Sequence, residues 1–210
     1  MQPIEYVKVD YKDRRPTTEY PARHGPDNPV PGIKQLWFER GEPTRFFGLA
    51  PDDADLTTPG ILLEIGPEEW AKLTEQRRAV RLQDLADHRW RIETGGVTLP
   101  NGARILTDRE SQAQVNSAYT TLRDGFITTA DFKGENGWVL ITLAEITPIA
   151  KAVARHVQPC FTAERRVGEK INAAEDAEAL HAINIAAEFA AELEAIKAEQ
   201  LEAEAQAATG

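Results

Sequence analysis

The chain has 210 residues, a formal net charge of -10 at pH 7 and one cysteine. Its acidity argues against nucleic acid as a partner, because that affinity comes from clustered lysine and arginine. A single cysteine excludes an internal disulfide framework and any multi-thiolate metal site. No apolar run approaches the length of a membrane span, and charges occupy the N-terminus where a signal peptide needs apolar residues. We therefore expect an unprocessed, soluble protein without membrane insertion.

The N-terminal part divides into an arm and a small packed unit. Residues 1–32 contain six prolines and little apolar periodicity, which predicts an extended Pro-rich arm. In residues 33–87, two aromatic-rich runs flank Arg40-Gly41-Glu42-Pro43, a predicted hairpin, and a third strand is ILLEI at 61–65. A helix is predicted to start at Gly66-Pro67-Glu68-Glu69, because proline suits the first helical position and carboxylates suit the positive end of the macrodipole. We expect this helix to run to the end of the segment.

Residues 88–171 carry the signals of a second unit of hairpins and helices. Its first two strands are predicted in HRWRIETGGVTL and ARIL, joined by Pro100-Asn101-Gly102, where Asn-Gly supplies the positive dihedrals of a tight turn. A helix is predicted from Thr107, whose hydroxyl fits a capping box with the carboxylate three residues later. A second hairpin is predicted around residues 134–137. The last helix contains Pro159, where we expect a kink.

Residues 172–210 are dominated by alanine and glutamate, which predicts an acidic helix or tail. The apolar positions form a thin seam, so this helix either docks on a partner or remains a frayed tail. A self-associating coiled coil is a further alternative, although alanines fill many seam positions and Gln200 interrupts the heptads. The predicted fold class is therefore α+β: two small units of antiparallel hairpins packed with helices, plus a long Ala/Glu-rich C-terminal helix.

Two side-chain groups invite a chemical interpretation. Thr107 beside Asp108 could be a hydroxyl nucleophile with an acidic neighbour, but no histidine lies nearby in sequence, and a helix cap explains the pattern without chemistry. His156 and Cys160 are four residues apart, as two metal ligands on one helical face would be. Zinc needs three or four ligands and no other histidine shows partner spacing, which favours a buried histidine and cysteine. We predict no catalytic, cofactor-binding or metal-binding residues and no cofactor.

Three surfaces are candidates for contacts with other molecules. The aromatic side chains of the first sheet form its core or, in part, a contact surface, since a small unit cannot cover all of them. The seam of the C-terminal helix is the second candidate. The third is a concentration of arginines that could bind an anionic surface or form an ordinary solvated face, at Arg77, Arg78, Arg81, Arg89 and Arg91. The predicted partner-contact residues are Trp37, Phe38, Phe46, Phe47, Phe189, Leu193 and Ile196.

The window from about residue 89 to residue 171 resembles a phage-associated family, the domain of unknown function numbered 4376. The matching residues are RWRIETGGVTLPNGARILTDRESQ, the pairs Phe132-Lys133 and Gly137-Trp138, and HVQPCFTAE at 156–164. Pro159 departs from the commoner alanine at its position. The resemblance implies a protein encoded near phage tail-fibre genes, and the family has no catalytic residues to carry over.

The resemblance, the Pro-rich arm and the thin-seamed helix together favour a non-enzymatic bacteriophage tail protein. We expect a structural virion component of the tail fibre or baseplate region, made in the host cytoplasm, that attaches the fibre through protein-protein interaction. Its partners would be other tail proteins, and we expect a homo-oligomer, with a trimer favoured by three-fold fibres. The alternatives are a tail-fibre assembly chaperone that is not retained in the virion, or a host-surface receptor-binding module. A hydrolase rests only on Thr107, Asp108 and scattered acidic residues.

Overall fold

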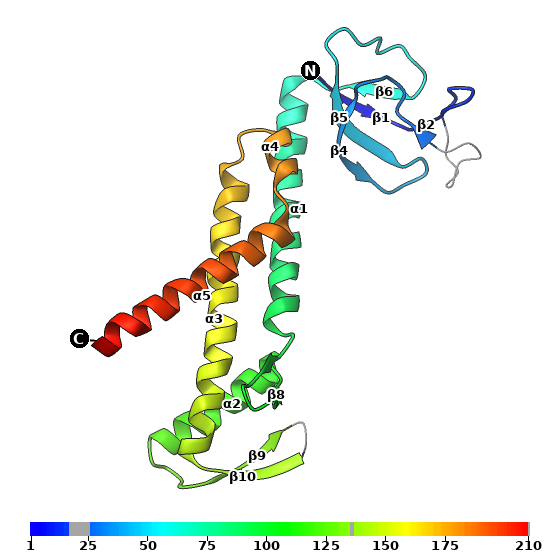
Figure 1. Ribbon diagram of the computed structural model, residues 1–210. Coiled ribbons are helices and arrows are strands. Elements are labelled where there is room, and N and C mark those ends of the chain that lie inside the picture. Colours follow the sequence, from blue (N-terminus) through cyan, green and yellow to red (C-terminus); the bar gives the residue numbers. More distant parts are fainter. Residues whose placement is uncertain (17–25, 135–136, 210) are drawn as a thin grey trace. The chain divides into compact units, whose positions relative to one another are not determined.

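The computed structural model describes residues 1–16, 26–134 and 137–209 (Figure 1). The chain forms two compact units: unit 1 comprises Met1–Val80 with Ala174–Ile183, and unit 2 comprises Arg81–Ala173 with Asn184–Gly210. The elements in chain order are β1 (Gln2–Tyr6), β2 (Val9–Asp10), β3 (Pro26–Asp27), β4 (Lys34–Glu39), β5 (Arg45–Ala50), β6 (Ile61–Glu64), α1 (Pro67–Glu93), β7 (Val97–Thr98), β8 (Arg104–Ile105), α2 (Arg109–Arg123), β9 (Ala130–Gly134), β10 (Gly137–Ile141), α3 (Leu143–Ala173), α4 (Ala177–Ala182) and α5 (Ile185–Thr209).

Unit 1 is built on an antiparallel sheet with the strand order β4-β5-β1-β6. The predicted hairpin β4–β5 and the third strand β6 are confirmed, as is the start of α1 at Pro67. Gly48 is required where β5 passes β4, because a Cβ there would lie 2.5 Å from the carbonyl oxygen of Lys34. The short helix α4 is capped at its N-terminus by Asp176, whose carboxylate accepts a hydrogen bond from the Ala179 amide.

The structure differs from the predicted arm over its first residues. Strand β1 lies inside the sheet between β5 and β6, and Ile4 and Tyr6 are fully buried. Their two-residue spacing puts both side chains on one face, and burying that face outweighs the turn signal of the nearby prolines. Pro3 is tolerated near the strand start, where its carbonyl still accepts a hydrogen bond from the Ile65 amide at 2.9 Å. Residues 17–25 of the predicted arm lie outside the described residues.

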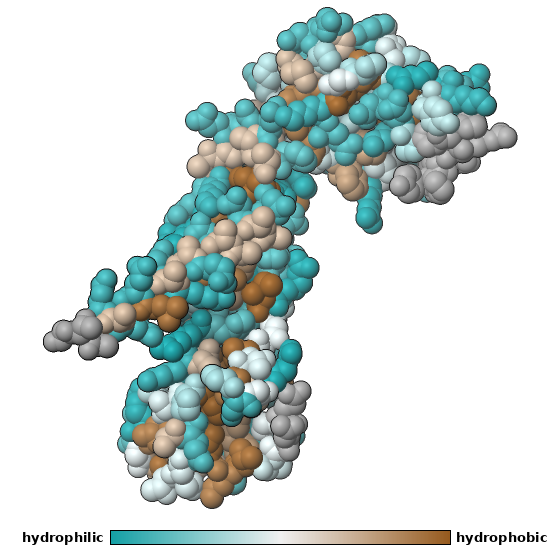
Figure 2. Space-filling model, in the orientation of Figure 1, coloured by the Kyte–Doolittle hydropathy of each residue, from teal (hydrophilic) through white to brown (hydrophobic). Residues whose placement is uncertain are grey.

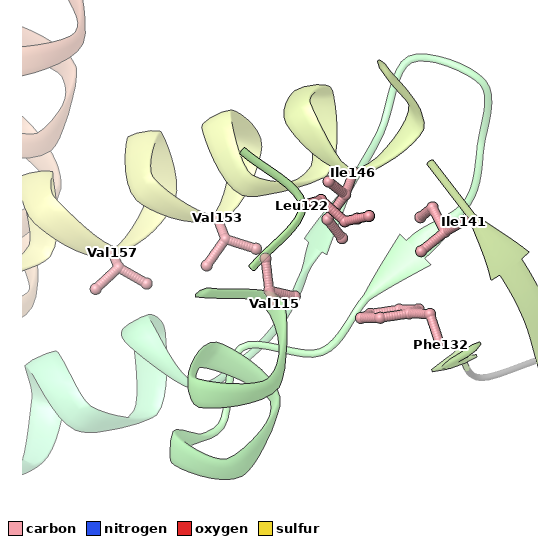
Figure 3. Packing of buried hydrophobic residues seen from close by; sticks show 7 residues of the cluster. All are labelled: Val115, Leu122, Phe132, Ile141, Ile146, Val153 and Val157. Carbon is pink, nitrogen blue, oxygen red and sulfur yellow. The ribbon is translucent and has the colours of Figure 1, made fainter. Parts of the chain in front are cut away.

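Unit 2 packs α2 and α5 against α3, with the hairpins β7–β8 and β9–β10 both at the end where α2 lies (Figure 1). Both predicted hairpins are confirmed, and Gly102 has the positive φ of 83° that the first turn needs. Helix α3 is continuous through Pro159. One hydrophobic core joins α2, the second hairpin and the start of α3, as Figure 3 shows for Val115, Leu122, Phe132, Ile141, Ile146, Val153 and Val157.

The predicted strand at HRWRIE is wrong, because α1 continues to Glu93. Alternation in RWRIE imitates a strand, but Leu85, Arg89 and Glu93 are spaced four apart and share one helical face. Leu85 and Glu93 are buried on that face. Helix α1 ends before Gly96, whose φ of 86° turns the chain into β7. The predicted boundary between residues 87 and 88 therefore falls inside a helix.

Candidate functional site

A buried polar cluster of unit 2 is centred on the carboxylate of Glu93, at the C-terminal end of α1. Glu93 is fully buried. It accepts hydrogen bonds from the guanidinium of Arg89, one turn earlier, and from Nη2 of Arg109 at 3.2 Å, and it forms an ion pair with Nη1 of Arg109 at 2.8 Å. The amide of Gln112 donates to it at 3.0 Å. A buried carboxylate is stable when paired and hydrogen-bonded in this way, so we call these four residues the Glu93 clamp.

The backbone of Glu93 is held by Thr107 and His156. The Thr107 hydroxyl donates to the Glu93 carbonyl at 2.6 Å and accepts from the Gly96 amide at 2.9 Å. The Nε2 atom of His156 on α3 lies 3.1 Å from the same carbonyl. The predicted cap is therefore wrong in its residue: Asp108 caps α2, accepting from the Ser111 amide at 3.0 Å. Thr107 instead fastens the start of α2 to the end of α1.

Arginine and aromatic side chains extend the clamp towards the surface. Arg89 donates from Nε to Glu164 of α3 at 2.9 Å and lies 4.8 Å above the ring of Phe161. Arg109 lies over Trp90 at 5.2 Å and over Phe161 at 5.7 Å. These cation–π contacts add to the ion pairs and hold both guanidinium groups in fixed positions. The clamp thus ties α1, α2 and α3 together.

This arrangement explains the motif residues without a reaction. The Thr107 hydroxyl donates its hydrogen bond to the backbone carbonyl of Glu93. That bond positions the helix and does not connect the hydroxyl to a general base. The Cys160 thiol donates to the His156 carbonyl at 3.2 Å, and burial, aided by the charge of Glu93, raises its pKa to about 11. A thiol with that pKa is a poor nucleophile and a poor ligand near neutral pH. Over residues 1–16, 26–134 and 137–209, no group of three His, Cys, Asp or Glu side chains is placed to hold a metal.

The predicted aromatic contact residues of unit 1 lie mostly in its core. Trp37 is buried between the rings of Phe47 and Trp70, at centroid distances of 5.4 and 5.1 Å. Phe46 is half-buried and stacks on Tyr6 at 5.6 Å. Phe38, at 48% exposure, is the one of the four predicted residues that faces solvent. Trp37 and Phe47 are therefore unavailable to a partner, and the core interpretation holds for them.

The predicted seam of α5 is used within unit 2. Phe189 is fully buried and meets the edge of the His88 ring at 5.0 Å, Ile196 is buried and Leu193 is half-buried. Ion pairs flank the seam: Arg166 of α3 contacts Glu199 at 2.8 Å and Glu192 at 3.3 Å. Helix α5 thus docks on α3 of its own chain.

The predicted arginine concentration is divided among separate contacts. Arg78 pairs with Glu75 at 3.0 Å and donates to the Ala174 carbonyl at 2.8 Å, both within unit 1. Arg89 belongs to the Glu93 clamp in unit 2. The Nε of Arg91 donates to the Asp87 carbonyl at 3.4 Å. These partners leave less positive charge for an anionic ligand than the sequence suggests.

A different surface, which we call the hairpin face, remains uncovered. It consists of the outer side of β9–β10, where Trp138 lies opposite Lys133 and Leu140 opposite Asp131. Trp138 is 69% exposed and Leu140 is 65% exposed, and Phe126 before β9 is 77% exposed. Figure 2 shows apolar surface at the end of unit 2 where Figure 1 places this hairpin. Sequence reasoning missed this face, although GWVLI is apolar at successive positions and a two-stranded hairpin can bury only one side.

The fold and the clamp define an α+β protein whose long helices are fastened by a buried ion cluster. The chain belongs to the family described as a domain of unknown function (DUF4376), whose model matches residues 76–209. This match confirms the resemblance seen over about residues 89–171 and extends it to α5. No curated protein and no solved structure matches the chain. No helix in the described part of the chain is long and apolar enough to cross a membrane.

Proposed function

We propose that this chain is a non-enzymatic bacteriophage tail protein that attaches the tail fibre in the fibre or baseplate region of the virion. The observation that carries the proposal is the hairpin face, which presents Trp138 and Leu140 to solvent. The phage context comes from the likeness of the clamp and hairpin residues to proteins encoded beside tail-fibre genes. A role in binding, rather than in catalysis, is supported by the Glu93 clamp, whose charged groups are occupied with one another.

The hairpin face has the chemistry of a protein contact. Large exposed aromatic and aliphatic side chains are enriched at interfaces, and tryptophan is the commonest residue to dominate their affinity. Lys133 lies over the Trp138 ring at 5.7 Å, so the face combines an apolar centre with a charged border. A fibre protein that covers this face would shield both apolar side chains from water.

The test is retention of the chain in purified phage particles. We expect the wild-type chain to remain through purification at a fixed copy number, measured by quantitative mass spectrometry. The double variant Trp138→Ser with Leu140→Ser should be lost from particles while its circular dichroism spectrum and melting temperature stay unchanged. The matched control is Leu62→Ser with Leu63→Ser, which alters two exposed leucines on β6 of unit 1.

Other outcomes would point to the alternatives. A chain that is absent from particles but co-purifies with fibre protein from the lysate would be an assembly chaperone. Retention of the hairpin variant at the wild-type copy number would contradict the role of this face. Trp37 and Phe47, two candidate contact residues for a receptor-binding module, are buried, so they do not favour that alternative over attachment.

A further inference from the structure

Unit 2 contains a slot of about 310 Å³ between β8 and β9. One wall is formed by residues 104–106 and the other by residues 132–134, and the first turns of α2 form the floor with Ser111, Gln114 and Val115. The slot holds the volume of about ten water molecules, which is the scale of side chains rather than of a packing defect. It shares Lys133 with the border of the hairpin face, but the exposed Trp138 and Leu140 of that face do not line it.

The lining pattern shows that the slot runs along strand edges. Successive side chains of a strand point to opposite faces, so a cavity on a sheet face is lined by alternate residues. Here three consecutive residues come from each wall, and among the described residues neither β7 nor β10 contributes. Strand β9 pairs only with β10 in the described structure, and β8 only with β7. The slot is therefore bordered by two strand edges that have no neighbouring strand.

We propose that this slot binds an extended β-strand of another polypeptide, which pairs with the free edges of β8 and β9. The occupant would join the two hairpins into a single sheet in the order β7-β8-strand-β9-β10. Unpaired edge amides and carbonyls are complementary to a main chain in extended conformation, which makes a strand the fitting occupant. That this strand comes from a tail protein rests on the function proposed above, whereas the pairing itself does not.

The walls and floor restrict the occupant further. Each wall is three residues long, which at about 3.3 Å per residue accommodates a strand of roughly three to five residues. Val115 and Phe132 are buried core residues that line the slot, so alternate side chains of the occupant that point inward should be apolar. Arg104, Glu110 and Lys133 line it as well, so both signs of charge are present. We therefore expect alternating apolar and polar residues in the bound strand, without a strong net charge.

The test begins with a displayed library of random nine-residue peptides, selected for binding to the purified full-length chain. One selected peptide is synthesised in two forms, unmodified and with alternate backbone nitrogens methylated. We expect an alternating apolar pattern among the selected peptides, at least tenfold weaker binding of the methylated form, and slower amide hydrogen exchange at residues 104–106 and 131–133 on binding. Methylation leaves the side chains in place and removes main-chain donors, so it separates strand pairing from simple apolar contact.

A pair of variants locates the binding site. Gln114→Trp fills the floor of the slot and should weaken the peptide at least tenfold. Asn116→Trp is the matched control, since Asn116 is another exposed amide on α2 that does not line the slot, and it should change affinity less than twofold. Equal effects of the two variants, protection elsewhere in the chain, or failure of the library to yield a binder would overturn the proposal. None of these results bears on retention in particles, so the two proposals fail independently.

Discussion

The burial of side chains in helix α5 and strand β10 is the opposite of what their compositions suggest. Helix α5 is rich in alanine and glutamate with a thin apolar seam, yet Phe189 and Ile196 are buried against their own chain. Strand β10 contains the run GWVLI, and three consecutive side chains of that run, Trp138 to Leu140, are exposed. A thin stripe is enough for a helix laid along α3, whereas the side of the hairpin that carries Trp138 and Leu140 is open to solvent, and Val139 on the other side is still 52% exposed. Burial is decided by the neighbouring layer as much as by composition.

This difference in burial changes the expected site of association from the C-terminal helix to the second hairpin. A homo-oligomer was predicted through the C-terminal helix, and that basis is lost because the helix uses its seam internally. What α5 leaves exposed is Leu201 near its end, at 68% exposure. The hairpin face and the slot are open surfaces of unit 2. Association of this protein is therefore expected to depend on β9 and β10, and shortening α5 should affect stability first.

The largest expected effect is on the α5 seam. Phe189→Ala removes a fully buried ring from the contact with α1 and α3 and should lower the free energy of unfolding by about 3 to 5 kcal/mol. Leu201→Ala on the same helix is the control and should cost less than about 0.5 kcal/mol. Urea unfolding followed by circular dichroism measures both. Equal small losses would mean that α5 does not dock on α3 in solution, and the comparison with β10 would fail.

A smaller effect is expected at Thr107, which fastens the start of α2 to the end of α1 beside the Glu93 clamp. Thr107→Val keeps the shape of the side chain but leaves the Glu93 carbonyl and the Gly96 amide without the hydroxyl. The loss should be about 1 to 3 kcal/mol, since both groups are buried or half-buried. Asp108→Ala, which removes only the cap of α2, should cost about 1 kcal/mol. A larger loss in the free energy of unfolding for Asp108→Ala than for Thr107→Val would mean that Thr107 does not fasten α2 to α1.

Much of the fold could be predicted because it follows local signals. Pro67 marked the start of α1, Asn101-Gly102 marked a hairpin, and the apolar runs of β4, β5, β9 and β10 were visible as strands. The errors came from residues whose environment is set by distant segments. Ile4 and Tyr6 are buried by strands that lie some forty to sixty residues later, as their pairing with β5 and β6 shows. The Glu93 clamp needs α2 and α3, so RWRIE alone could not reveal it.

The stability contributed by the α5 seam should depend on pH through His88. Burial beside Phe189, with the charge of Arg91 second, lowers the pKa of His88 below its ordinary 6.5. The unfolded chain then binds more protons than the folded chain between the lowered pKa and 6.5, so stability rises with pH in this window and levels off above it. His88→Gln should flatten the dependence of the melting temperature between about pH 5.5 and pH 7.5. An unchanged slope in this variant would assign the effect to other groups.

The smallest expected effect on stability belongs to the hairpin face. Leu140 is mostly exposed in the folded chain, so Leu140→Ser should change the free energy of unfolding by less than about 0.5 kcal/mol. The same substitution should still reduce binding to fibre protein, because an exposed apolar side chain contributes when a partner covers it. Unfolding and binding are measured on the same preparation, with Leu63→Ser on β6 as the control for exposed leucines. A loss of stability as large as that of Phe189→Ala would mean that β10 is covered within the folded chain. If serine at position 140 leaves the folded chain stable but weakens binding to fibre protein, the apolar composition of β10 is explained by contact with that partner.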